Sequence, residues 1–294
     1  MQLTNKGKNM DGIVIINKPK NCTSHDVVKK VKKIVNEKVG HTGTLDPNAT
    51  GVLPLLIGKG TQLSKYMIEH DKTYEAILML GEKRDTADGE GKIIEEQEIL
   101  PQMLEVENVK KALRKMLGKQ QQIPPMYSAI KVNGKKLYEY ARCGENIEVQ
   151  PRTIEIYNID LIDINTKEKQ IKFIVSCSKG TYIRALCEKI AENLGTIGYM
   201  KELKRIKVGK FSIEQAISTE QFEKEPEKNI ITIEKFFEDK KSIEISSKKL
   251  ELFLNGVQLT YNLEDGIYKI YENQKFIGTG IIKEKLLKRD IILV

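Results

Sequence analysis

One loop of this sequence carries a carboxylate whose neighbouring residues suit a catalytic group. The segment GHTGTLDPNATGVL, residues 40–53, holds Asp46 between Gly43 and Gly51. Pro47 follows the acid directly and biases its backbone toward an extended conformation, and glycines let a ligand approach the chain closely. A carboxylate held in such a loop suits a nucleophile or a general base. The alternative, a turn or capping aspartate, is what local chemistry alone favours.

The composition excludes some classes of protein and only weakly indicates a partner. Lys and Arg exceed Asp and Glu by 49 − 41 = 8 residues, an excess that favours polyanionic partners. Only seven of the 49 basic residues are arginine, so each arginine is a mild hint that a planar, bidentate group is needed there. The sequence has no apolar run long enough for a transmembrane helix, and its polar, basic start does not resemble a secretory signal.

The cysteines and glycines exclude further kinds of site. The four cysteines form no C-x-x-C pair and have no histidine cluster beside them, so we expect reduced thiols and no metal site. No G-x-G-x-x-G fingerprint and no G-x-x-x-x-G-K-[ST] loop is present, so dinucleotide or nucleotide triphosphate binding has no support.

Hydrophobic periodicity predicts a mixed α/β chain. Thr23 and Asp26 have the spacing of a capping box ahead of an amphipathic helix whose other face carries four lysines. That basic face is either a phosphate surface or an ordinary solvated face. Further helices are predicted at residues 61–70, 108–117 and 182–193. Strands are predicted at residues 12–17, 52–58, 73–80, 153–164, 170–177, 266–271, 276–282 and 290–294.

A segment at residues 123–152 differs from the rest of the chain. It contains an Asn133-Gly134 hairpin signal and interleaves lysine and arginine with Tyr127, Tyr138 and Tyr140. Basic residues among aromatics are typical of a nucleic-acid contact region. The alternative is a surface hairpin and helix with half-buried tyrosines.

Six motifs, taken in order over residues 12–211, resemble the TruB family of tRNA pseudouridine-55 synthases. The loop around Asp46 resembles the catalytic motif of that family, and INKPKNCTS (residues 16–24) resembles its early motif. KTYEA (72–76), the Tyr-bearing segment at 123–152, CSKGTYIRAL (177–186) and ELKRIKVGKF (202–211) follow in the family's order. One departure is Asn21, where the family has glycine; asparagine tolerates positive φ, so we expect the turn to survive.

The resemblance implies roles for single residues. It makes Asp46 the catalytic nucleophile and Arg184 the cation that keeps it ionised and oriented. Tyr74 would pack against the flipped target base, Leu203 would cover its other side, and Tyr182 would shape the pocket. His41 would fill the gap left by the displaced base or stabilise the displaced loop; the alternative is a hydrogen-bonded loop histidine. Lys18 and Lys20 are candidate phosphate contacts.

The resemblance also implies an architecture and a partner. The expected fold is a mixed α/β (α+β) pseudouridine-synthase core with a central, mostly antiparallel sheet in residues 1–240. A thumb insertion at 123–152 and a small β-rich, PUA-like RNA-binding domain at 241–294 complete it. The expected substrate is the T-arm of tRNA, and a cytoplasmic monomer is expected, with no cofactor, metal, membrane or guide RNA.

Two rival functions remain open at this stage. The chain could be an RNA-binding or RNA-folding protein without catalysis, although Asp46, Tyr74 and Arg184 are all present. It could also resemble guide-dependent relatives that act on ribosomal RNA. The intact thumb segment and the lack of long extensions favour stand-alone action on tRNA.

Overall fold

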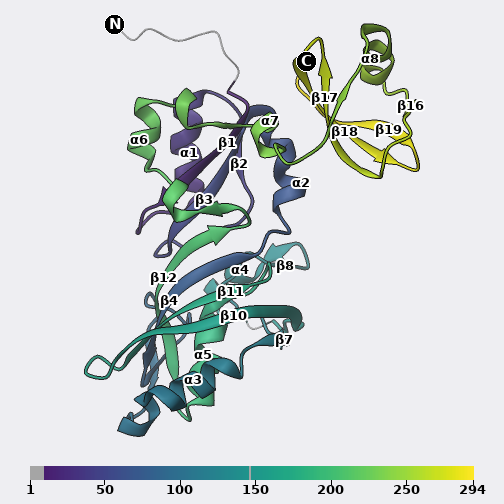
Figure 1. Cartoon of the computed structure of the whole chain (residues 1–294). Coiled ribbons are helices and arrows are strands. Elements are labelled where there is room, and N and C mark those ends of the chain that lie inside the picture. The colour runs from purple at the N-terminus through teal and green to yellow at the C-terminus, as the bar shows by residue number, and fades with distance from the viewer. Residues whose placement is uncertain (1–9, 146) are drawn as a thin grey trace, which may run out of the picture.

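Two sheets of unequal size organise the chain (Figure 1). The computed structural model describes residues 10–145 and 147–294; the polar start of the chain, predicted not to be a secretory signal, lies largely outside them. A large body holds a ten-stranded sheet, and a smaller β unit is built from the C-terminal residues. No helix in these two ranges is long and apolar enough to span a membrane.

The large sheet has the strand order β14-β1-β3-β12-β4-β11-β10-β7. Neighbouring strands on this path run antiparallel except β12 and β3, which are parallel, so the expected mostly antiparallel sheet is confirmed. Two short strands, β2 and β13, pair with β3 and β12. The bounds are β1 Gly12–Lys18, β2 Val39–His41, β3 Thr50–Ile57, β4 Lys72–Leu80, β7 Gly118–Gln122, β10 Arg152–Asn165, β11 Gln170–Cys177, β12 Gly198–Val208, β13 Phe211–Ser212 and β14 Ile231–Thr232.

Helices pack on this sheet and contribute side chains to two of its hydrophobic cores. Helices α3 and α5 contribute to the core built on β4, β10 and β11, whereas α1 contributes to a separate core on β1 and β3. A hairpin of β5 and β6 lies between β4 and α3 in sequence. The bounds are α1 Ser24–Val35, α2 Ser64–Met67, α3 Val106–Arg114, α5 Ile183–Asn193, α6 Thr219–Lys224, α7 Ile233–Phe236, β5 Glu82–Arg84 and β6 Ile93–Glu96.

Local signals in the sequence set the start of α1. The Thr23 hydroxyl accepts a hydrogen bond from the Asp26 backbone N–H at 3.1 Å, and the Asp26 carboxylate accepts one from the Thr23 N–H at 3.0 Å, which confirms the capping box. Asn21 has φ 63°, the conformation that a glycine would otherwise supply. The turn that leads from β1 into α1 therefore keeps its shape without the glycine.

The helix predicted at residues 61–70 is wrong in extent. Residues Gly58–Leu63 form a 3₁₀ helix, and only Ser64–Met67 form the α-helix α2. Gly58 has φ 56°, and the Thr61 hydroxyl donates to the Gly58 carbonyl at 2.8 Å, so the segment begins as a tight turn. Apolar spacing alone cannot reveal this tighter winding.

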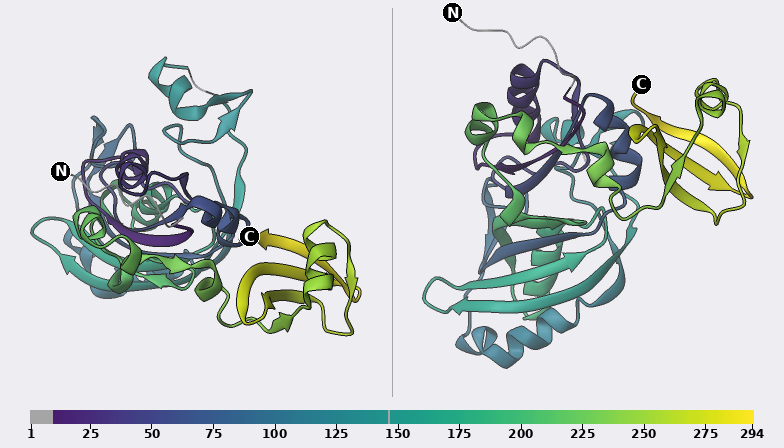
Figure 2. Two further views of the ribbon diagram at one scale, coloured as in Figure 1. Left: turned by 90° about the horizontal axis from the view of Figure 1, so that it is seen from above. Right: turned by 45° about the horizontal axis from the view of Figure 1, so that its top comes forward.

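The segment 123–152, which we call the thumb, projects from the body (Figure 2, left). It carries the strands β8 Lys131–Val132 and β9 Lys135–Lys136 and the helix α4 Leu137–Arg142. Asn133 and Gly134 connect the two strands with φ 51° and 83°, the positive values that a type I′ turn requires. The predicted hairpin is therefore confirmed.

The C-terminal unit has its own sheet and its own core. Its strand order is β15-β17-β18-β19-β16, and one helix packs on it. The bounds are β15 Ser242–Glu244, α8 Ser247–Leu254, β16 Leu259–Thr260, β17 Gly266–Glu272, β18 Lys275–Lys283 and β19 Leu286–Ile292. The β-rich character agrees with the expectation, whereas the PUA-like assignment and the boundary at residue 240 stay predictions.

A buried carboxylate joins the two units. The Asp290 side chain on β19 is 2% exposed and accepts hydrogen bonds from the Tyr66 hydroxyl at 2.5 Å and the Thr279 hydroxyl at 2.8 Å. Lys65 pairs with the same carboxylate from the body. Burial and the Asp290 contact raise the pKa of Tyr66, so its hydroxyl stays protonated and donates.

We expect Asp290→Ala to loosen this junction. The substitution leaves the Tyr66 and Thr279 hydroxyls without their acceptor, which costs about 1–3 kcal/mol for a buried group. Limited proteolysis should then cleave faster between α7 and β15, and the urea midpoint should fall. Glu251→Ala on the exposed face of α8 is the matched control. Equal cleavage rates and equal urea midpoints in the two variants would show that Asp290 does not hold the two units together.

Candidate active site

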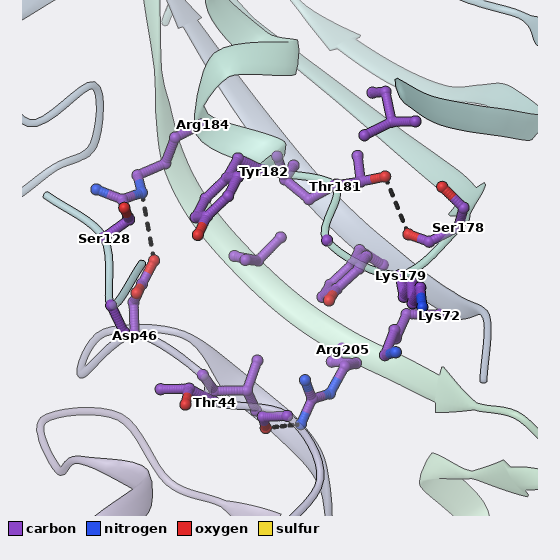
Figure 3. A pocket seen from close by; sticks show the side chains of 18 of the residues that line it. Thr44, Asp46, Lys72, Ser128, Ser178, Lys179, Thr181, Tyr182, Arg184 and Arg205 are labelled. Carbon is purple, nitrogen blue, oxygen red and sulfur yellow. Dashed lines mark hydrogen bonds and ion pairs between the residues drawn. The ribbon is translucent and has the colours of Figure 1, made fainter. Parts of the chain in front are cut away.

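A cavity of about 650 Å³ opens between the sheet and the base of the thumb (Figure 3). Strands β4 and β12 line it together with three separate segments, at residues 42–46, 127–129 and 178–184. Asp46, Tyr74, Tyr182, Arg184 and Leu203 are all among the lining residues. The structure therefore brings five of the six predicted site residues to one place, although they come from distant parts of the sequence.

Hydrogen bonds to the chain around it hold the Asp46 loop in place. The Ser24 hydroxyl accepts from the Leu45 N–H at 2.9 Å and donates to the Leu45 carbonyl at 3.1 Å. The Ala49 N–H donates to the Asp46 carbonyl at 3.1 Å. Leu45 itself is buried, so the loop is pinned immediately before and after the carboxylate.

Lys18 stabilises the same loop through hydrogen bonds to backbone carbonyls. Its side chain is fully buried, and its ammonium donates to the carbonyls of Pro19, Cys22 and Pro47 at 2.9, 2.6 and 2.9 Å. These three contacts use all three N–H groups, so the suggestion that Lys18 contacts phosphate is wrong. Instead, it ties the turn after β1 to the residue that follows Asp46.

Arg184 forms the centre of the charged end of the cavity. Its side chain is 5% exposed, and its Nε lies 3.3 Å from an Asp46 carboxylate oxygen. One terminal nitrogen lies 3.5 Å from Asp88 and donates to the Thr86 carbonyl at 3.1 Å. The other donates to the Tyr127 carbonyl at 2.7 Å. The guanidinium thus links the Asp46 loop, the turn between β5 and β6, and the base of the thumb.

Burial and charge act in opposite directions on Asp46. Burial is the largest influence and raises the pKa of Asp46 above its ordinary value, and the nearby Asp88 carboxylate adds to the rise. Arg184 and Lys18 lower the pKa, which agrees in direction with the expected role of Arg184. The net result is a raised pKa, so Arg184 offsets part of the burial effect but does not outweigh it.

Apolar and aromatic side chains form the wall next to this charged end. Tyr74 on β4 is 8% exposed, and burial raises the pKa of its hydroxyl. Leu203 on β12 lies opposite Ala76 of β4 and is partly buried. The backbone of Tyr182 is fixed by Gln122, whose amide oxygen accepts from the Tyr182 N–H at 2.8 Å and whose amide nitrogen donates to its carbonyl at 3.0 Å.

His41 is the predicted site residue that the structure leaves outside the lining of this cavity. It ends β2, one residue before the lining segment, and its Nδ1 accepts a weak contact from the Gly43 N–H at 3.4 Å. Burial, together with the Arg205 and His25 charges, lowers the pKa of His41. The position fits both a loop histidine and a residue at the cavity mouth, so its role stays a prediction.

Sequence reasoning missed several groups at this site. Asp88 lies in a loop that reads as an ordinary charged turn, and Lys72 and Arg205 read as flanking residues of Tyr74 and Leu203. Ser128 is 4% exposed, lines the cavity, and its hydroxyl has no hydrogen-bond partner among the described residues. The scarcity of arginine is the one signal that pointed toward Arg205. Within residues 10–145 and 147–294, no cluster of His, Cys, Asp and Glu suits a metal ion.

Comparison with known proteins covers almost the whole chain. Residues 29–183 match the TruB family pseudouridylate synthase N-terminal domain, and residues 184–235 match the tRNA pseudouridylate synthase B C-terminal domain. A relative from Clostridium kluyveri named tRNA pseudouridine synthase B is 42% identical, over 94% of this chain and 96% of that protein. A relative of the same name from Aquifex aeolicus is 38% identical, over 97% and 100%.

A solved structure supports the fold independently. It is described as an H/ACA RNP bound to a substrate RNA containing 2′-deoxyuridine, and one of its chains superposes with a TM-score of 0.68. The match covers 97% of this chain and 86% of that one at 23% sequence identity. At this identity the likeness shows a shared fold and nothing about substrate.

The charge balance at Asp46 predicts a titration shift. Because the Asp88 carboxylate disfavours a second negative charge, Asp88→Asn should lower the pKa of Asp46. We expect the ¹³C-carboxyl NMR titration of Asp46 to have its midpoint above 3.8 in the unchanged protein and at a lower pH in Asp88→Asn. Asp85→Asn, on the same loop, is the control and should leave the midpoint in place; an upward shift in Asp88→Asn would contradict the account.

Proposed function

This chain belongs to the TruB family of pseudouridylate synthases, and we propose that it converts uridine 55 in the T-loop of tRNA to pseudouridine. The observation that carries the proposal is the pairing of the Asp46 carboxylate with the buried Arg184 guanidinium, in a cavity that also contains Tyr74. A carboxylate, a cation that orients it and an aromatic face for a base are the groups that this isomerisation needs.

Asp46 is the proposed reacting group. Its carboxylate oxygen is held by Arg184, yet the side chain remains 42% exposed, so a sugar or base in the cavity can reach it. Lys18 and Ser24 fix the backbone of its loop, which keeps the carboxylate in one position during the reaction. Attack on the sugar, attack on the base and proton abstraction would all use the Asp46 carboxylate.

Tyr74, Leu203 and Tyr182 are the proposed walls for the target uracil. A nucleotide that leaves the T-loop stack loses base stacking, which costs a few kcal/mol. Contact of the flipped base with the Tyr74 ring and the Leu203 side chain offsets part of that cost. His41, one residue before the lining segment, is the proposed contact to the RNA that the base leaves behind.

The thumb is the proposed grip on the T-arm. Its Lys135 and Lys136 lie over the rings of Tyr140 and Tyr138, at 4.5 and 5.3 Å from the ring centroids, so the basic groups and aromatic faces form one surface. Recognition would depend mainly on the folded shape of the RNA. We further propose that the protein acts as a monomer in the cytoplasm and needs neither a guide RNA nor a cofactor.

Two substrates distinguish this function from its rivals. The protein is incubated with an unmodified tRNA transcript and with an isolated T-arm hairpin, each without added RNA, and pseudouridine is mapped. Conversion at position 55 in both supports stand-alone action on tRNA. Binding without conversion would favour an RNA-binding protein, and conversion only in the presence of a guide would favour the guide-dependent alternative.

Replacement of the carboxylate separates catalysis from binding. Asp46→Asn keeps the shape of the side chain but removes its charge, so we expect turnover to be lost while the affinity for tRNA changes by no more than a few-fold. Single-turnover assays and filter binding measure the two quantities. Asp85→Asn, outside the cavity lining, is the control; an active Asp46→Asn variant would overturn the assignment.

Replacing lysines of the thumb by uncharged residues should weaken RNA binding, because fewer RNA phosphates are then neutralised. For Lys131→Gln, Lys135→Gln and Lys136→Gln combined, we expect lower affinity and a log–log salt dependence that is shallower by about 0.7–0.9 for each phosphate no longer neutralised. The same triple change at Lys110, Lys111 and Lys115, on and just after α3, is the control. An unchanged salt slope in the thumb variant would show that these lysines do not contact RNA.

A further inference from the structure

Two buried cations lie across the cavity from the Asp46–Arg184 pair. Lys72, the first residue of β4, is 7% exposed, and Arg205 on β12 is 1% exposed. Both line the cavity, and Figure 3 shows their side chains on the side opposite Asp46. The roles proposed for the other cavity residues leave both of these charges without a function.

Neither cation is neutralised by a carboxylate partner within the described part of the chain. The Lys72 ammonium donates to the His70 carbonyl, which leaves two of its three N–H groups unused. Arg205 donates to the Val52 carbonyl at 2.8 Å and to the Gly43 carbonyl at 3.0 Å. A buried charge without a counter-charge is costly, so a cavity that retains two of them is suited to an electron-rich ligand.

The titration of Lys72 reflects the missing counter-charge. Burial, and then the Arg205 charge, lowers the pKa of Lys72 and outweighs the opposing influence of Cys177, Asp71 and Glu69, so a bound electron-rich ligand would favour the charged ammonium. Lys179, the other lysine on this side of the cavity, differs because it is exposed and pairs with Glu69. Lys72 and Arg205 are therefore the two buried lining cations that have no carboxylate partner among the described residues; Arg152, which also lines the cavity, is exposed.

The strand geometry specifies which part of a nucleotide these cations would meet. Lys72 and Tyr74 are two residues apart on β4, so they share a face and are separated by about 6.5 Å along the strand. If the sugar of the target uridine is next to Asp46 and its base lies on Tyr74, the far edge of the base points toward Lys72. That edge carries O4 of uracil, and O2 lies on the side of the ring between that edge and the sugar, whereas the phosphates belong to the sugar end.

We propose that Lys72 and Arg205 form a subsite for the uracil carbonyl oxygens and stabilise the negative charge of the base while it is detached. The isomerisation breaks the C1′–N1 bond, forms a C1′–C5 bond and moves one proton from C5 to N1. When C1′–N1 breaks, its electron pair leaves with the uracil, and the charge spreads onto both carbonyl oxygens. Fixed cations at the point where charge develops lower the barrier to such a step. This inference rests on the proposed function.

The test compares turnover with binding in Lys72→Met, which keeps most of the side-chain length and removes the charge. On a T-arm hairpin that the unchanged protein converts, we expect the single-turnover rate to fall at least about tenfold while the dissociation constant changes less than threefold. Lys72→Arg should recover part of the rate. Lys207→Met is the matched control, because Lys207 is exposed on β12 and pairs with Thr73, the neighbour of Lys72.

A second substrate separates charge stabilisation from a structural role. Fluorine at C5 withdraws electrons and stabilises the uracil anion by itself. The penalty of Lys72→Met should therefore be smaller for consumption of 5-fluorouridine than for uridine at the same position, whereas a distorted cavity would slow both equally. If Lys72→Met does not fold, Lys72→Gln takes its place in the same comparison.

Three outcomes would overturn the inference. They are an unchanged rate in Lys72→Met, equal penalties on the two substrates, or a loss confined to affinity with a weaker salt dependence, which would indicate a phosphate contact. In all three cases the unchanged protein still converts the uridine, so the proposed function stands. Failure of the inference about Lys72 and Arg205 is therefore distinguishable from failure of the proposed function.

Discussion

The site depends on how the Arg184 guanidinium is surrounded. It contacts two carboxylates and two backbone carbonyls, and these four acceptors come from the Asp46 loop, the turn between β5 and β6, and the base of the thumb. A planar group with fixed donors can satisfy all of them only in one arrangement. The proposed RNA-binding surface and the proposed reacting carboxylate are thereby joined through one side chain, with Tyr127 as the link to the thumb.

The cavity separates charge into two ends. At one end Asp46 and Asp88 share Arg184, and burial raises the pKa of Asp46 despite that cation. At the other end Lys72 and Arg205 have no carboxylate partner among the described residues. Tyr74 lines the same cavity, two residues after Lys72 on β4. A nucleotide whose sugar needs a carboxylate and whose base becomes electron-rich fits this polarity in one orientation, which would align C1′ with Asp46.

Sequence reasoning succeeded where a local pattern determines the structure. The capping box at Thr23, the positive φ at Asn21 and the Asn133-Gly134 turn each depend on a few neighbouring residues, and all are present. The co-location of Asp46, Tyr74 and Arg184 was available only from the order of whole motifs. Sequence reasoning failed where contacts between distant chain segments determine what a side chain binds. Lys18 is an example, because its three acceptors include a carbonyl 29 residues away. Asp88 was missed for the same reason, because its partner is almost a hundred positions further along.

The most direct measurement is a crystal structure of the protein with a T-arm hairpin that carries 5-fluorouridine at the target position. The account predicts the target nucleotide flipped into the cavity, with its sugar C1′ next to the Asp46 carboxylate, its base on Tyr74 and its carbonyl edge toward Lys72. A target base that remains stacked in the T-loop, or one that enters with its sugar at the Lys72 end, would contradict it.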